Sequence, residues 1–156
     1  MLNNYSTAYS TDFLYHCMRA KFFNDEATIE LKWLENNLEE LELSNVLFYC
    51  SVLDQHHQWE QLYSLSKRNL PHRYLYNIAT ILANSLEPDN LSKSKELMDS
   101  LIALGYKVKG IKHNLGIINQ NLGLIGTAKK LLQEEYDEFY KQIFQDDLAP
   151  LETLTV

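Results

Sequence analysis

The chain has 156 residues, of which 46% are apolar and 22% are charged, so neither a disordered nor a fibrous class of protein fits it. Leucine supplies 27 residues and valine only 4, a balance that favours helix formers over strand formers. The net charge of −7 argues against a nucleic-acid-binding protein, because contacts to phosphates require a basic surface. We therefore expect one all-α domain over residues 1–156, with frayed ends at residues 1–9 and 149–156.

Targeting signals and cysteine spacing indicate where such a protein resides. No apolar run reaches the roughly 18 residues of a membrane span, and the first residues lack the basic and then apolar order of a signal peptide. Cys17 and Cys50 lie outside any CxxC spacing, which favours reduced thiols over a disulfide framework. We expect a cytoplasmic protein that does not bind membranes and whose two thiols are small core residues.

Charge is distributed unevenly along the chain. Residues 1–60 carry a net charge of −7, residues 61–130 of +6, and residues 131–156 of −6. Charges on successive helices can complement one another or be solvated, or the basic middle segment can bind an acidic segment of a partner. The pattern leaves both interpretations open.

Apolar residues recur at helical spacing through the first part of the chain. The first two expected helices meet near Asn24 and Asp25, either of which is a suitable N-cap, and Ser44 is expected to cap the third helix. A break over residues 54–57 precedes the fourth helix. The apolar positions of these four helices are Phe13, Leu14, Cys17, Met18 and Ala20; Ile29, Trp33, Leu34, Leu38 and Leu41; Val46, Leu47, Cys50 and Leu53; Trp59, Leu62, Tyr63 and Leu65.

Proline and glycine divide the rest of the chain. Pro71 opens a fifth helix, and residues 88–90 are expected to form a turn before a helix that Ser92 caps and Gly105 ends. The last two helices run from about 109 to 122 and from about 125 to 144, with Gly123 and Gly126 delimiting their connection. Eight helices with short links predict four antiparallel hairpins.

A repeat of about 34 residues runs through these hairpins. Residues 128–132 align with residues 94–98, and residues 114–118 align with residues 77–81. The pair Leu115-Gly116, followed by Ala128 and then Leu132, resembles the tetratricopeptide repeat. The resemblance implies a right-handed stack of hairpins, in which small residues at 116 and 128 let two helices approach closely and Leu132 packs onto the next hairpin.

Some positions depart from that repeat. Lys112 stands where the repeat has Trp, Asn119 stands where it has an aromatic residue, and no proline ends the repeat. A less regular helical bundle is the alternative. An early set of residues resembles, within the same class, the small chaperones of type III secretion needle subunits, which hold an amphipathic helix of the subunit in a concave face. That set is Glu26, Ala27, Ile29, Trp33, Leu34, Glu39, Glu40, Leu53 and Tyr63.

Candidate catalytic and metal-binding groups lack the spacing that their chemistry requires. His56 and His57 follow Cys50, but no CxxC or HxxxH pair is present to hold zinc. Glu134, Glu135, Asp137 and Glu138 are expected to form a solvated acidic face. With no GxGxxG or GxxxxGK[ST] loop, we expect no catalytic residue, no cofactor and no metal.

The expected function is therefore non-enzymatic: an adaptor or chaperone that binds a peptide or an amphipathic helix of a protein partner in a concave groove. The alternative is a scaffold or self-assembling homo-oligomer, because the first helix is too apolar for a solvated end. The residues expected to face the groove are Phe48, Ser51, Arg73, Tyr76, Thr80, Asn84, His113, Ile117, Gln120 and Asn121.

Overall fold

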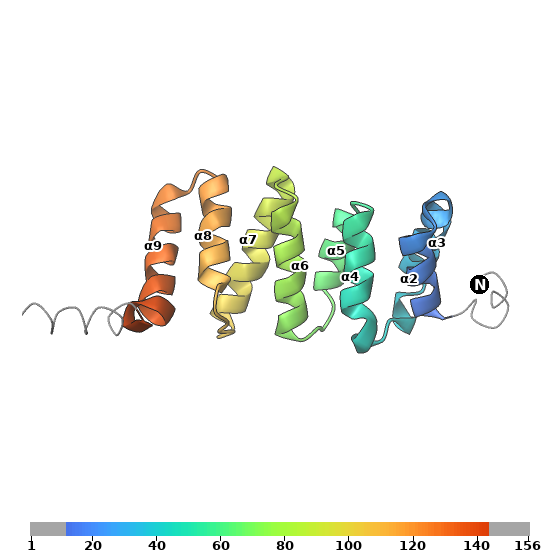
Figure 1. Cartoon of the computed structure of the whole chain (residues 1–156), viewed down its shortest axis with the longest axis horizontal. Helices are drawn as coiled ribbons and strands as arrows, with labels where there is room; N and C mark the ends of the chain where they lie inside the picture. Colours follow the sequence, from blue (N-terminus) through green and yellow to red (C-terminus); the bar gives the residue numbers. More distant parts are fainter. Residues whose placement is uncertain (1–11, 144–156) are drawn as a thin grey trace, which may run out of the picture. The chain divides into compact units, whose positions relative to one another are not determined.

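The computed structural model describes residues 12–143, and this part of the chain forms eight α-helices and no strand (Figure 1). The all-α fold class is confirmed. The expected frayed ends, 1–9 and 149–156, lie outside the described residues. The helices are α2 (Phe13–Phe22), α3 (Ala27–Asn36), α4 (Val46–Gln55), α5 (Trp59–Ser66), α6 (His72–Asn84), α7 (Pro88–Ala103), α8 (Ile111–Asn121) and α9 (Ile125–Glu135).

The chain divides into two compact units, Met1–Ile78 (unit 1) and Ala79–Val156 (unit 2), and the boundary falls inside α6. Unit 1 contains α2 to α5 and the first half of α6. Unit 2 contains the second half of α6 and α7 to α9. The single domain over residues 1–156 and the right-handed stacking of hairpins stay predictions.

In unit 1, α2 packs against α3 and α4, and α4 packs against α5. Phe13 of α2 meets Tyr49 of α4 edge-on, with 5.1 Å between the ring centroids. Such a pair adds about 0.5 to 1.5 kcal/mol to the free energy of burial. The core of the unit includes the fully buried side chains of Leu34, Tyr49, Leu53, Leu62 and Leu65.

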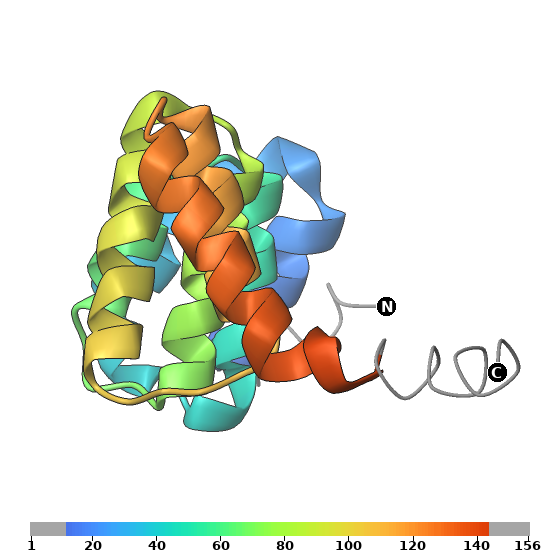
Figure 2. The same cartoon turned by 90° about the vertical axis from the view of Figure 1, so that its left-hand side faces the viewer.

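In unit 2, α8 and α9 form an antiparallel pair, visible in both views (Figures 1 and 2). A Cβ atom added to Gly116 would lie 3.0 Å from Leu132 Cγ and 3.4 Å from the carbonyl oxygen of Ala128, so the two helices approach closely there. The predicted role of Gly116 and Ala128 is confirmed. Leu132 was expected to pack onto the next hairpin, but it lies over Gly116 of its own hairpin. Ser94 Oγ of α7 donates to the Ala79 carbonyl of α6 at 2.6 Å.

Three helices end in the same left-handed turn, in which two N–H groups bond back to the last carbonyls of the helix. After α7, Gly105 has φ 82°, and its N–H donates to the Ile102 carbonyl at 3.0 Å. Gly123 ends α8 in the same way with φ 81°. Both glycine ends were predicted from the sequence. The third turn, after α4, uses His57 with φ 54°, a residue that carries no such signal.

Helix starts differ from the prediction at three places. Short 3₁₀-helices at Asn24–Glu26 and Leu43–Asn45 lead into α3 and α4, so neither Asn24, Asp25 nor Ser44 caps a helix with its side chain. The expected turn at residues 88–90 is the first turn of α7, with Pro88 at a position where its missing N–H costs nothing. Gly126, expected in the α8–α9 connection, lies inside α9.

The apolar stripe of the second expected helix is also shorter than predicted. Helix α3 ends at Asn36, so Leu38 lies in a 3₁₀-helix and Leu41 lies outside a helix. Ile29 is 73% exposed and Leu47 is 50% exposed, so both are surface residues rather than core residues.

Candidate functional site

Two bends in unit 2 bring together the ends of α7, α8 and α9. The connection from α7 to α8 begins with the turn at Gly105 and ends at Gly110, whose φ of 96° precedes the first residue of α8. On the other side, α9 ends at Glu135 and continues as a π-helical turn, Tyr136–Tyr140. Such turns occur frequently at functional sites. Between the two bends lies a pocket.

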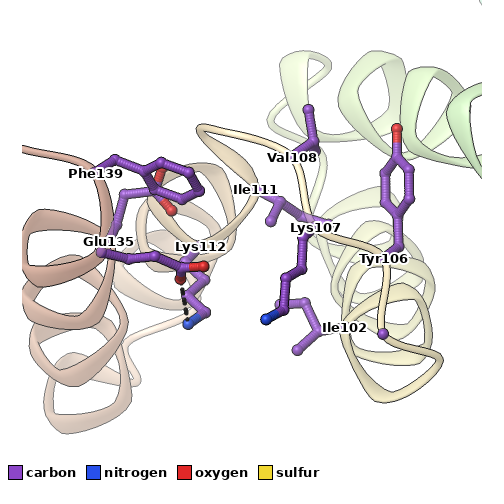
Figure 3. A pocket seen from close by; sticks show the side chains of 10 residues that line it. Ile102, Tyr106, Lys107, Val108, Ile111, Lys112, Glu135 and Phe139 are labelled. Atoms are coloured by element: carbon purple, nitrogen blue, oxygen red, sulfur yellow. Dashed lines mark hydrogen bonds and ion pairs between the residues drawn. The ribbon is translucent and has the colours of Figure 1, made fainter.

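The pocket has a volume of about 110 Å³, several times the roughly 30 Å³ that one water molecule occupies in the liquid. Figure 3 shows Phe139, Glu135 and Lys112 on one side and Ile102, Tyr106 and Lys107 on the other. A group of a few non-hydrogen atoms therefore fits inside. The apolar part of the wall consists of Ile102, Val108, Ile111 and Phe139.

Glu135 is the one acid of the pocket wall that is buried, with 2% of its surface exposed. Its Oε1 atom accepts a hydrogen bond from the Gly110 N–H at 2.5 Å, which places a carboxylate against the positive end of α8. Its Oε2 atom is buried and has no hydrogen-bond partner among the described residues. A buried polar atom without a partner is costly and calls for an explanation.

The two lysines of the pocket wall differ in how they are held. Lys112 Nζ lies 3.0 Å from Glu138 Oε2 and 3.6 Å from Glu134 Oε2. The hydrogen bond to Glu138 raises the pKa of Lys112, so this lysine is charged and engaged at neutral pH. Lys107 is exposed to solvent. The pocket wall thus includes one buried carboxylate, that of Glu135, while the charge of Lys112 is taken up by two other acids.

The buried position of Glu135 corrects the expectation that all four acids of this segment form a solvated face. Glu134 and Glu138 do lie together, around Lys112. Glu135 instead continues the packed stripe of α9, at seven residues after Ala128 and three after Leu132. That stripe is the signal in the sequence by which Glu135 could have been identified.

Four of the residues predicted to face a groove share one surface of α8. His113, Ile117, Gln120 and Asn121 are exposed, and Ile117 is 42% exposed although it is a large apolar residue. Their spacing places them on one face of the helix. These four lie outside the set of residues that line the pocket. On α6, Asn84 is exposed and Thr80 is half-buried.

The remaining predicted residues lie in unit 1. Phe48 and Ser51 of α4 are half-buried around Lys21 of α2. Lys21 Nζ donates to Ser51 Oγ at 3.2 Å and lies 5.4 Å from the centre of the Phe48 ring. On α6, Arg73 is exposed and Tyr76 is half-buried. The structure therefore brings Phe48 and Ser51 together, but in the packing of α2 against α4.

Other candidates for chemistry are held in structural positions. Cys17 and Cys50 are fully buried as free thiols, and burial raises the pKa of each to about 12, far from the range of a reactive thiolate. His56 Nε2 is bonded to the Ala20 carbonyl oxygen at 2.7 Å. Over residues 12–143, no cluster of three or more His, Cys, Asp or Glu side chains is arranged to hold a metal ion.

A buried charged cluster in unit 1 was not predicted. Glu30 of α3 contacts His16 Nδ1 through Oε2 and accepts from Arg19 Nε at 2.9 Å through Oε1. All three residues are less than a tenth exposed. The His16 ring stacks on Trp33 with 3.7 Å between centroids. The cluster joins α2 to α3, and residues 14 positions apart gave no local signal for it.

Comparison of the chain with protein-family models, with characterised proteins and with solved structures found no match. The resemblance to the tetratricopeptide repeat therefore stays a prediction. None of the helices in the described range is long and apolar enough to cross a membrane.

Proposed function

We propose that the protein is a non-enzymatic binding module, an adaptor or chaperone that holds a peptide or an amphipathic helix of a protein partner. The observation that carries this proposal is the exposed face of α8, where Ile117 is surrounded by His113, Gln120 and Asn121. An apolar residue at the centre of a polar surround is typical of the residues that dominate the free energy of protein association.

Two further observations support the proposal. The close approach of α8 and α9 at Gly116 and Ala128 agrees with the tetratricopeptide-like hairpin that the sequence resembles, a class of scaffold built for peptide binding. The two thiols are buried with raised pKa values, which removes the most nucleophilic side chains from consideration. Needle-subunit chaperones are the narrower version of the proposal, in which the partner segment is an amphipathic helix.

A matched pair of substitutions tests the role of the α8 face. Ile117→Asp places a charge at its centre, and Ile125→Asp places the same charge on α9 at a residue of similar exposure, 48% against 42%. Tagged wild-type and variant proteins are expressed in the native cells and purified, and the stoichiometry of co-purifying proteins is measured. We expect a stoichiometric partner that Ile117→Asp removes and Ile125→Asp retains, with equal melting temperatures for both variants.

The proposal fails under either of two results. One is a wild-type protein that purifies without a stoichiometric partner. The other is a partner that both variants retain equally, which would place the binding surface elsewhere on the molecule.

A second candidate function, self-assembly into a larger scaffold, is favoured by the exposed apolar residues of unit 1. Phe22 is 64% exposed at the end of α2, and Ile29 is 73% exposed near the start of α3. Exposed apolar side chains mark association surfaces where they form a contiguous patch. Sedimentation over a range of concentrations tests this candidate: we expect oligomers that Ile29→Ser dissociates, whereas a monomer at every concentration rejects it.

A further inference from the structure

Glu135, which lines the pocket, has one carboxylate oxygen that accepts no hydrogen bond from the described residues. Glu135 Oε2 is buried and without a partner in the described part of the chain, although Oε1 of the same carboxylate is bonded to Gly110. We propose that this pocket binds an alkylammonium group, which donates a hydrogen bond to Glu135 Oε2. A lysine side chain of a protein partner is one source, which rests on the proposed function; a free small amine is the other.

The single unshared oxygen favours an ammonium over a guanidinium group. Arginine binds carboxylates best through two parallel hydrogen bonds, which require both oxygens. Here the Gly110 N–H already bonds to Oε1 at 2.5 Å, so a fork of two donors would have to share that oxygen with Gly110. An ammonium is a compact charge that one oxygen can accept, and a neutral donor would leave the buried charge unbalanced.

The walls of the pocket suit the methylene chain of such a group. Ile102, Val108 and Phe139 supply apolar contacts, and lysine side chains commonly lie with the stem on an apolar surface and the charge at a polar end. A volume of about 110 Å³ admits a chain of a few carbon atoms with its ammonium, and is too small for a folded segment of a partner.

The two lysines of the pocket wall determine how much positive charge an incoming ammonium group meets. Lys112 is held by Glu138 at 3.0 Å and Glu134 at 3.6 Å, so its charge is balanced by acids other than Glu135. Lys107 is exposed at the pocket and repels an incoming cation. Removing the charge of Lys107 is therefore expected to strengthen ammonium binding, whereas an anion-binding pocket would lose affinity.

The test uses n-butylammonium chloride with the full chain at neutral pH, followed by the amide resonance of Gly110 in two-dimensional NMR spectra. The variant is Glu135→Gln, whose amide oxygen still accepts from Gly110 while the charge is lost. The control is Asp137→Asn, which removes the same charge from a nearby exposed acid that neither lines the pocket nor pairs with Lys112. We expect a saturable shift in the wild type, a loss of affinity of about tenfold or more in Glu135→Gln, and little change in Asp137→Asn.

Three results overturn the inference. They are the absence of a saturable Gly110 shift in the wild type, equal affinity in the wild type and Glu135→Gln, and an equal loss in Glu135→Gln and Asp137→Asn. If Glu135→Gln does not fold, the Lys107→Met variant provides the test. A higher affinity for n-butylammonium than in the wild type supports the site, and an unchanged or lower affinity overturns it.

A second arm distinguishes the two sources of the ammonium. A short blocked peptide with one central lysine is titrated beside the same peptide with Nε-acetyl-lysine, which keeps the stem and removes the charge. Binding of the lysine peptide alone supports a partner's lysine, whereas binding of n-butylammonium without either peptide supports a free amine and rejects the lysine. Because these probes need no natural partner, the pocket experiment can succeed when the Ile117 experiment fails. The Ile117 experiment can likewise succeed when the pocket experiment fails.

Discussion

Gly116 is the residue where α8 and α9 leave least room, and replacing it tests that packing. In Gly116→Ala the new Cβ atom would lie 3.0 Å from Leu132 Cγ and 3.1 Å from Leu132 Cδ2, closer than ordinary van der Waals contact. Overpacking of this kind costs about 1 to 3 kcal/mol. Alanine is also a better helix former than glycine by about 1 kcal/mol. We expect a net loss of about 1 kcal/mol in the free energy of unfolding.

A second substitution separates the two effects. Leu132→Ala removes both side-chain atoms that the new Cβ would meet, so only the helix-forming advantage remains. In that background Gly116→Ala is expected to raise stability by about 1 kcal/mol, a reversal of sign. Gly126→Ala in α9 is the matched control, because no atom lies within 4 Å of its added Cβ, and it is expected to stabilise in both backgrounds.

Urea unfolding followed by circular dichroism gives these free energies for the five variants and the wild type. The reasoning is refuted if Gly116→Ala has the same effect with and without Leu132. A gain in both backgrounds would mean that the helices have room for the methyl group. A loss in both would place the cost at the Ala128 carbonyl, 3.4 Å from the added Cβ, rather than at Leu132.

Three other predictions concern buried charges, a helix end and the thiols. Glu30→Gln removes one of the two carboxylates that pair with buried Arg19, Glu26 being the other, and should cost about 1.5 to 3 kcal/mol in thermal or urea unfolding, whereas the exposed control Glu35→Gln should cost little. Leu86→Gly should stabilise by about 1 kcal/mol, because Leu86 is 65% exposed and holds φ at 58°; an unchanged stability would contradict the strain. Burial raises the pKa of Cys17 and Cys50 from 9.0 to about 12, so alkylation at pH 8 should be about a thousandfold slower folded than unfolded. Because the folded pKa is the higher one, stability from these thiols should hold below about pH 9 and fall as pH approaches 12; rapid native labelling would refute both expectations.

The helix ends show which parts of the fold a sequence can specify. Gly105 and Gly123 were predictable because a left-handed turn favours glycine strongly. His57 makes the same turn after α4 without that signal, since its conformation is imposed by the bonds back to α4. The 3₁₀ entries to α3 and α4 were missed for the opposite reason, because Asn24 and Ser44 are good capping residues that the structure does not use as caps.

The candidate pocket shows where sequence reasoning fails. Glu135 stands among three other acids, and a run of acids predicts a solvated face unless a distant donor is known. That donor, the Gly110 N–H, lies 25 residues away and is available only because α8 begins there. The same holds in unit 1 for His16 and Glu30, which contact each other although they lie 14 residues apart in the sequence. By contrast, the exposure of Ile117 and its neighbours on α8 follows from helical spacing alone, and those residues were identified from the sequence.

The π-helical turn at Tyr136–Tyr140 has a consequence for how chains of this kind can diverge. It accommodates one residue more than an uninterrupted α-helix would, and one residue corresponds to about 100° of rotation around the helix axis. Deleting a single residue there would turn the segment into an uninterrupted α-helix and leave the residues that follow, up to 143, near their present face, because the π turn already absorbs the extra residue. A one-residue gap earlier in α9 would instead rotate the residues after it by about 100°.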